Sequence, residues 1–201
     1  MVPLIAAAAC HGAASMMASF AKAVQGEGSA TASSEGKSAF GAEDFQRMKS
    51  FLGNRFFCNA DPTGLAVNIP VAESEGEGSS DSEEAFDSMM RNSALLQLET
   101  REMNPYYGPG VFIRLAMPNR LPSEDDGYRI AARLNELEML GECEAYHYGA
   151  WCFTRNTLHY VAFLPNQMKG DGSTLMNLGL YQMARARWAY GKINELLAAN
   201  S

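Results

Sequence analysis

The chain has 201 residues, 47% of them apolar, which is enough to bury one full hydrophobic core with additional segments outside it. Asp and Glu outnumber Lys and Arg by 23 to 16, so the net charge of −7 disfavours nucleic acid as a partner. The four cysteines lack CxxC spacing and indicate a reducing, cytoplasmic location, and the absence of a long apolar run in the sequence excludes a transmembrane segment.

Residues 1–24 form an Ala- and Met-rich N-terminal segment that we predict to be helical and to dock on the domain or on a partner. Its apolar run precedes the first basic residue, Lys22, whereas a secretory signal carries its charge in front. The alternative is an exported or lipid-anchored protein, because Ala7 to Cys10 resembles a lipoprotein cleavage site. Residues 25–41, rich in Gly, Ser and Ala, are predicted to be a flexible linker.

Residues 42–201 are predicted to form one α+β domain in which a hairpin-plus-helix unit recurs three times after a first helix at 42–52. Each returning strand ends at a proline, and these prolines recur at intervals of about 48 residues. The expected hairpins join 55–59 to 64–71, 94–99 to 111–118, and 146–153 to 158–164. The helices expected after them are 82–92, 123–140 and 173–198.

Local signals support several of these boundaries. Asp61-Pro62-Thr63-Gly64 is typical of a type I turn, and Asn156 is the residue of the third turn best able to adopt an unusual dihedral angle. Ser123 and Asp126 form a capping box at the start of a helix. We therefore predict an antiparallel sheet with helices packed on one or both of its faces.

The third hairpin is read as apolar on both faces. Trp151, Phe153, Val161 and Phe163 are assigned to one face, and Tyr146, Tyr148, Leu158, Tyr160 and Leu164 to the other. Strands of this kind need cover on each side, from helices, a second copy or a client protein.

The usual enzyme motifs GxSxG, HExxH, Walker A and GxGxxG do not occur, so the sequence predicts no catalytic residue, no cofactor and no metal. The alternative is a small-molecule or metal-binding protein, or an enzyme, with a pocket near His147, His159 and Cys152, to which Cys143 could contribute. On a continuous strand Cys152 would point away from Cys143 and His147, which weakens this alternative.

Two sets of charged residues are interpreted as structural rather than catalytic. Glu136, Glu138, Glu142 and Glu144 lie around a predicted helix end, where exposure is the default. Arg185, Arg187 and Lys192 are interpreted as favourable charges near a helix C-terminus, with contact to an acidic partner as the alternative.

The last helix carries two apolar stripes, more than one packed face requires. Large amphipathic side chains there and on the third hairpin are the candidates for partner contact. They are Tyr146, Tyr148, Trp151, Tyr181 and Trp188.

Residues 94–198 resemble the YbjN-like family and the related type III secretion chaperone-like fold. The resemblance lies in a helix ending Arg133-Leu134-Asn135-Glu136-Leu137, the hairpin from Gly149 to Leu164, and a Gly-containing turn at 169–173 that leads into a long terminal helix. It implies a dimer-prone α+β binding domain without a cofactor. The N-terminal segment and the unit at 55–92 depart from that pattern.

The function expected from the sequence is a non-enzymatic protein-binding module, chaperone-like or regulatory. It would engage another protein or a second copy, with a homodimer favoured, through an apolar surface of sheet and helix.

Overall fold

The structure is a computed structural model that describes residues 37–72, 92–118 and 121–199. The N-terminal segment 1–24, most of the linker 25–41 and nearly all of the helix expected at 82–92 lie outside the described residues.

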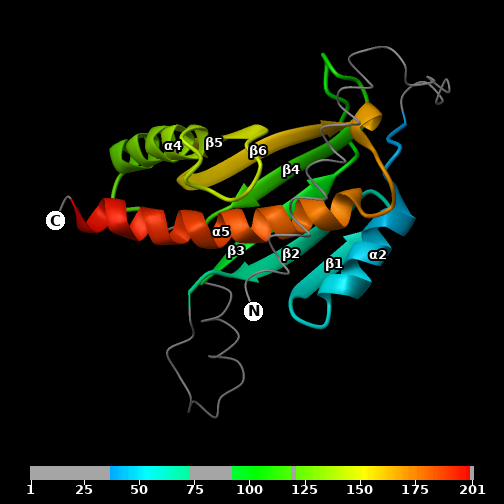
Figure 1. Ribbon diagram of the computed structural model, residues 1–201, viewed down its shortest axis with the longest axis horizontal. Helices are drawn as coiled ribbons and strands as arrows, with labels where there is room; N and C mark the ends of the chain where they lie inside the picture. The colour runs from blue at the N-terminus through cyan, green and yellow to red at the C-terminus, as the bar shows by residue number, and fades with distance from the viewer. Residues whose placement is uncertain (1–36, 73–91, 119–120, 200–201) are drawn as a thin grey trace, which may run out of the picture.

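Six strands form one antiparallel sheet (Figure 1). They are β1 (Phe57–Asp61), β2 (Gly64–Pro70), β3 (Ser93–Glu99), β4 (Gly110–Ala116), β5 (Gly149–Thr154) and β6 (Thr157–Pro165). Their order is β1-β2-β3-β4-β6-β5, so the three predicted hairpins are confirmed as strand pairs. The third hairpin joins the sheet through its second strand, which leaves β5 at an edge.

Two hairpins close with two-residue turns of different kinds. Pro62 and Thr63 do not have positive φ, as the predicted type I turn requires, and Asp61 accepts a 2.7 Å hydrogen bond from the Thr63 amide. In the third hairpin both Arg155 and Asn156 have positive φ, of 50° and 57°. The expectation for Asn156 is confirmed, and Arg155 adopts the same left-handed conformation because the twist of the hairpin selects it.

Three α-helices are described, α2 (Ala42–Leu52), α4 (Glu124–Met139) and α5 (Thr174–Ala198), together with the short 3-10 helix η1 (Asn166–Met168). The N-cap expected at Ser123 is confirmed, since its hydroxyl accepts a hydrogen bond from the Asp126 amide. The Asp126 carboxylate accepts from the Ser123 hydroxyl at 2.6 Å rather than from the Ser123 amide, so the predicted capping box is only half formed. The helix ends at Met139, and Gly141 follows it with a φ of 81°. In this conformation the amides of Gly141 and Glu142 donate to the carbonyls of Glu138 and Leu137.

The helices cover one face of the sheet (Figure 1). Helix α2 packs on β1 and β2, α4 packs on β5 and β6, and α5 crosses between them and contacts both helices. Alternate strand side chains such as Leu96, Leu98, Ile113 and Leu115 point into this layer and are fully buried. The sequence predicts helices on one or both faces of the sheet, and the described helices all lie on one face.

The expected assignment of faces in the third hairpin is wrong. Trp151 pairs with Tyr160 and Phe153 with Leu158, so these four share the buried face, whereas Val161 lies on the opposite one. The reason is the two-residue turn, because it makes odd-numbered residues of β5 face even-numbered residues of β6. Strand β5 also begins at Gly149, after the predicted start at residue 146.

The outer edge of β5 is occupied by a side chain of α4. The Asn135 amide group donates to the Trp151 carbonyl at 2.9 Å and accepts from the Trp151 amide at 2.7 Å. These are the two backbone groups that a seventh strand would use at this residue. None of the described helices has the length and apolar character needed to cross a membrane.

Candidate interaction surface

The face of the sheet turned away from the helices carries apolar side chains that no described helix or strand covers. We call this surface the open face. Its apolar members are Phe57, Ala66, Leu95, Phe112, Val161 and Phe163. Val161 is 36% exposed and Phe57 is 58% exposed, and the others are half-buried. Phe112, Phe163 and Val161 adjoin one another, whereas Phe57, Ala66 and Leu95 alternate in the register with Asn68, Gln97 and Arg114. An exposed surface that mixes apolar and polar side chains in this way is a candidate binding site.

Aromatic rings connect the open face to the loop between β3 and β4. Phe112 and Phe163 are register partners with ring centroids 4.8 Å apart, and Tyr107 stacks on Phe163 at 6.3 Å. The loop is held in shape because the Asn104 side chain accepts hydrogen bonds from the amides of Tyr106 and Tyr107. Tyr106 is 90% exposed, so the loop presents a ring to solvent next to the sheet.

Two charged residues of opposite sign stand exposed on the open face, Arg114 on β4 and Glu99 on β3. Neither forms an ion pair or a side-chain hydrogen bond within the described ranges. The pKa of His159 is lowered by its burial and, to a smaller extent, by the nearby positive charge of Arg114. The Nδ1 atom of that histidine is buried without a hydrogen-bond partner among the described residues.

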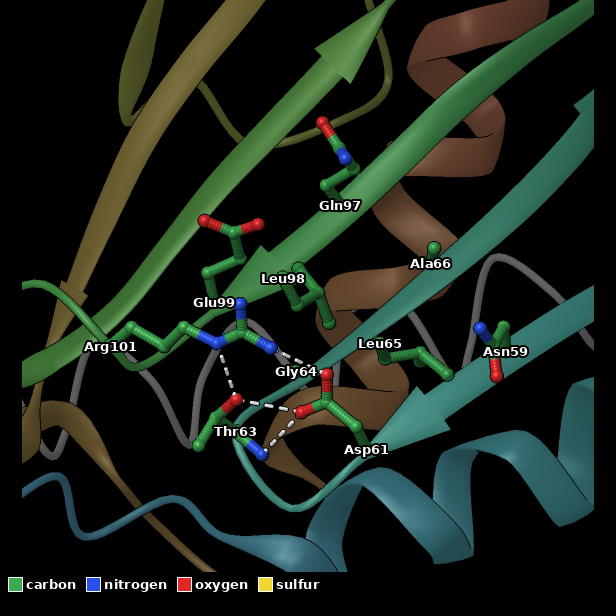
Figure 2. A pocket seen from close by; sticks show the side chains of 10 residues that line it. All are labelled: Asn59, Asp61, Thr63, Gly64, Leu65, Ala66, Gln97, Leu98, Glu99 and Arg101. Atoms are coloured by element: carbon green, nitrogen blue, oxygen red, sulfur yellow. Dashed lines mark hydrogen bonds and ion pairs between the residues drawn. The ribbon is translucent and has the colours of Figure 1, made fainter.

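A hollow of about 100 Å³ lies on the open face over strands β1, β2 and β3, next to the turn between β1 and β2 (Figure 2). Arg101 closes one side of it by contacting Asp61 at 2.7 Å and Thr63 at 2.7 Å. The hydrogen bonds from Thr63 lower the pKa of Asp61. The hollow is much smaller than the roughly 300 Å³ that a small-molecule site needs, so it suits a few waters or one side chain of a partner.

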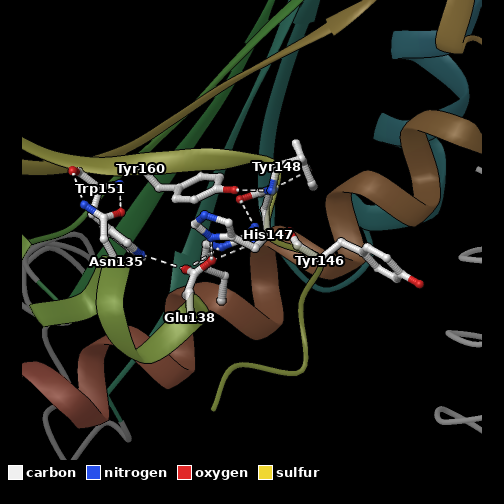
Figure 3. A network of polar contacts seen from close by, with 9 residues as sticks. Asn135, Glu138, Tyr146, His147, Tyr148, Trp151 and Tyr160 are labelled. Carbon is white, nitrogen blue, oxygen red and sulfur yellow. Dashed lines mark hydrogen bonds and ion pairs between the residues drawn. The ribbon is translucent and has the colours of Figure 1, made fainter. Parts of the chain in front are cut away.

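On the covered face, a network of polar side chains joins α4 to α5 (Figure 3). Arg185 of α5 and Glu138 of α4 are both fully buried, and the guanidinium binds the carboxylate through two hydrogen bonds of 2.9 and 3.2 Å. Arg185 also donates to Gln182 and to the Tyr146 carbonyl, and it lies 3.8 Å from the ring centre of Tyr160. These contacts replace the water that the cation loses on burial.

The carboxylate of Glu138 gathers two further donors. The indole nitrogen of Trp151 donates to it at 2.7 Å, and the His147 Nδ1 atom lies 3.1 Å from its other oxygen. In Figure 3 the Glu138 carboxylate lies between Trp151 and His147. The network thus fixes α4, α5 and the start of the third hairpin relative to one another, and we assign it to the architecture of the domain.

Two interpretations made from the sequence are corrected by this network. Glu138 was expected in solvent and is buried, because it continues the apolar seam of α4 one turn beyond Leu134. The sequence assigns Arg185 to a favourable interaction with the helix C-terminus, but the structure pairs it with Glu138 of α4, and it is the largest fully buried side chain among the described residues. Glu136 and Glu142 are solvent-exposed, as expected.

The alternative pocket of His147, His159 and Cys152 is split between the two faces of the sheet. His147 contacts Glu138 on the helix side, whereas His159 and Cys152 are register partners on the open face. Cys143 is buried beside Ala145 and Tyr181. Among the described residues, His, Cys, Asp and Glu form no group of three able to hold a metal ion.

The five candidate partner contacts lie in the helix layer and around the third hairpin. Trp151 and Tyr181 are buried, Tyr148 and Trp188 are half-buried, and Tyr146 is 38% exposed. Tyr146 packs edge-on against Tyr181, and Tyr148 accepts a hydrogen bond from Gln182 while burial raises its pKa. Their role in partner contact stays a prediction, for which Tyr146 has the most accessible surface.

The sequence singles out Val161 and Phe163 as part of an apolar face, but it does not single out Phe112, Arg114 or Glu99. The signal is present in β4, where Val111, Ile113 and Leu115 alternate with Phe112 and Arg114. A large aromatic side chain on the solvent side of a central strand is the signal that could have identified this side as a candidate interaction surface. No protein-family model, curated protein sequence or solved structure matches this chain.

Proposed function

We propose that the chain is a non-enzymatic protein-binding module, chaperone-like or regulatory, whose binding surface is the open face of the sheet. The observation that carries this proposal is the half-exposed apolar surface of Leu95, Phe112, Val161 and Phe163 at the centre of a six-stranded sheet. Removing such side chains from water is the main favourable term in protein association.

The arrangement of the histidines and Cys152 agrees with this role. His147 lies on one face of the sheet and His159 and Cys152 on the other, which argues against a substrate pocket shared by these three residues. The resemblance to type III secretion chaperone-like proteins, which stays a proposal, points to the same class of function.

The test is a charged substitution on the open face. Val161→Lys places a cation in the centre of this surface, where Val161 is already 36% exposed, so the domain should still fold. We expect protein ligands captured by immobilised full-length chain to be reduced by at least roughly tenfold. The matched control is Leu180→Lys, since Leu180 is 45% exposed on α5, on the helix side. If both variants capture the same ligands in the same amounts, the open face is not the binding surface.

A further inference from the structure

We propose that the protein that covers the open face is a second copy of this chain, packed sheet against sheet about a two-fold axis, with Arg114 of each copy paired to Glu99 of the other. This inference rests on the proposed function and names the partner at the same surface.

The positions of the two charges are the first argument. Glu99 lies opposite Phe112, and Gln97 lies opposite Arg114, so these four residues stand at the corners of a rectangle on β3 and β4, about 4.8 Å across the strands and about 6.7 Å along them. The two charges occupy opposite corners of that rectangle. A two-fold axis laid along the other diagonal, through Gln97 and Phe112, brings each Arg114 close to Glu99 of the other copy, within reach of these long side chains. Isologous pairing requires such a self-complementary surface.

The second argument is that both charges are exposed and have no partner in the part of the chain that the structure describes. Arg114 and Glu99 make no ion pair or side-chain hydrogen bond to any described residue, although they lie on adjacent strands. An isolated charge among apolar side chains opposes burial by an apolar partner, because desolvation is costly. A partner that supplies the opposite charge at each point removes this penalty, and a second copy does so twice by symmetry.

The apolar residues fit the same axis. Phe112 lies on the axis and meets its own counterpart, and Phe163, its register partner 4.8 Å away, lies beside it. Pairing therefore assembles four rings at the centre of the interface, an arrangement that stabilises association beyond the area buried. Because the axis is diagonal to the strands, the two sheets cross steeply, as in orthogonal sheet packing.

The available area is sufficient for a dimer. Six strands spaced about 4.8 Å apart and about seven residues long cover roughly 25 by 23 Å. Each copy therefore buries roughly 600 Å², and the pair buries about 1,200 Å², which is the lower limit of a standard stable interface. We expect a dimer that dissociates on dilution in the micromolar range, about 1 μM or above.

The experiment uses charge reversal in the full-length chain, with mass measured by light scattering and dissociation by sedimentation. In R114E both interface pairs become acid against acid, and in E99R both become base against base. Each single variant should dissociate at least roughly tenfold more readily than the unsubstituted chain. When the two variants are mixed, every pair again joins opposite charges, so a heterodimer should form. The double variant E99R/R114E should regain the original dissociation constant.

The control is R187E, which makes the same change of net charge at an exposed position of α5. It should leave the dimer unchanged, and urea unfolding should show that all variants fold. The inference is overturned if the unsubstituted chain is a monomer up to about 100 μM, if the single variants remain dimers, or if mixing them restores nothing. One outcome would overturn the self-pairing alone. In that outcome the unsubstituted chain is a monomer, but Val161→Lys still loses its captured ligands. The open face would then bind another protein or residues 1–24.

Discussion

The guanidinium of Arg185 is enclosed by four hydrogen bonds and by the ring of Tyr160, with no exposure to solvent. A cation is stable there only because Glu138 supplies the counter-charge and the Tyr146 carbonyl and Gln182 satisfy further donors. Such a network also specifies one way of docking α5 on α4, because any sliding of the helices would leave buried groups unpaired.

The first prediction concerns this pair. Arg185→Met leaves the Glu138 carboxylate buried without its cation, so we expect the free energy of unfolding in urea to fall by about 3–5 kcal/mol. The double variant Arg185→Met, Glu138→Leu should be less destabilised than the single one, because neither charge is then stranded. Unfolding curves that show additive losses would contradict the coupling.

An exposed ion pair on α4, the helix that carries Glu138, provides the control. Arg133 and Glu136 are 2.6 Å apart, but their side chains are 44% and 56% exposed. Arg133→Ala should therefore cost less than about 1 kcal/mol. Comparable losses from the two arginines would mean that burial does not decide the strength of the ion pair.

The burial of Arg185 could not be predicted from the sequence because its partner lies far away in the chain, on another helix. A local signal exists for Glu138, which falls at the spacing of Ile130, Leu134 and Leu137 on the apolar side of α4. An acid in an apolar seam indicates a buried counter-charge, but it does not identify which cation supplies it.

Helix α4 meets β5 at a glycine, where the ring of Phe153 occupies the space that a Cβ atom would need. A Cβ atom built on Gly127 of α4 would lie 2.5 Å from the ring of Phe153 on β5, closer than any real contact. Gly191 of α5 has open space at the same position. The same residue type thus serves packing in one helix and has no packing role in the other.

The second prediction compares these two glycines. Gly191→Ala should stabilise the domain by about 0.5–1 kcal/mol, because alanine favours helix. Gly127→Ala should destabilise it by about 1–3 kcal/mol, since Phe153 or the helix must move. Thermal unfolding measures both, and an equal gain in the two variants would show that α4 does not depend on the close approach.

At the scale of elements, most of the fold could be predicted from local patterns. The first helix, the three hairpins, the start of α4 at Ser123 and the long α5 all follow from turn residues, caps and apolar spacing. The faces of the third hairpin could not be assigned, because they depend on the left-handed conformation of both Arg155 and Asn156. Arginine gives no sign of that conformation in a sequence.

The molecule as a whole is a single sheet with helices on one side, and its strand order places β6 rather than β5 next to β4. That order was not predictable, because it depends on long-range pairing between Gly110–Ala116 and residues about fifty positions later. The open face escaped prediction for the same reason, since it exists only when β3, β4 and β6 lie side by side.

The third prediction concerns the acid stability of the whole domain. Hydrogen bonds from Thr63, Ser123 and Ser173 hold the pKa values of Asp61, Asp126 and Asp171 below 3.8 in the folded chain. A lowered pKa in the folded state stabilises the protein fully above the unfolded value of 3.8, and this contribution is lost as the pH falls through the folded value. The urea midpoint should therefore decline below pH 3.8.

The variant Asp126→Asn tests this expectation, because the asparagine side-chain oxygen can still accept the hydrogen bond from the Ser123 hydroxyl but the residue does not titrate. Its urea midpoint should decline less steeply with acid than that of the unsubstituted chain. Asp125→Asn, one residue earlier in the same helix turn, is the control and should keep the original slope. Parallel slopes in all three proteins would assign the acid sensitivity to other groups.

The amide side chain of Asn135 has a consequence for uncontrolled assembly. Trp151 already has its amide and carbonyl bonded by a side chain that imitates a neighbouring strand. A stray extended segment, or the edge of an unrelated sheet, would have to displace Asn135 before it could add to β5. The molecule thus has a built-in barrier to fibrillar stacking on this side of the sheet.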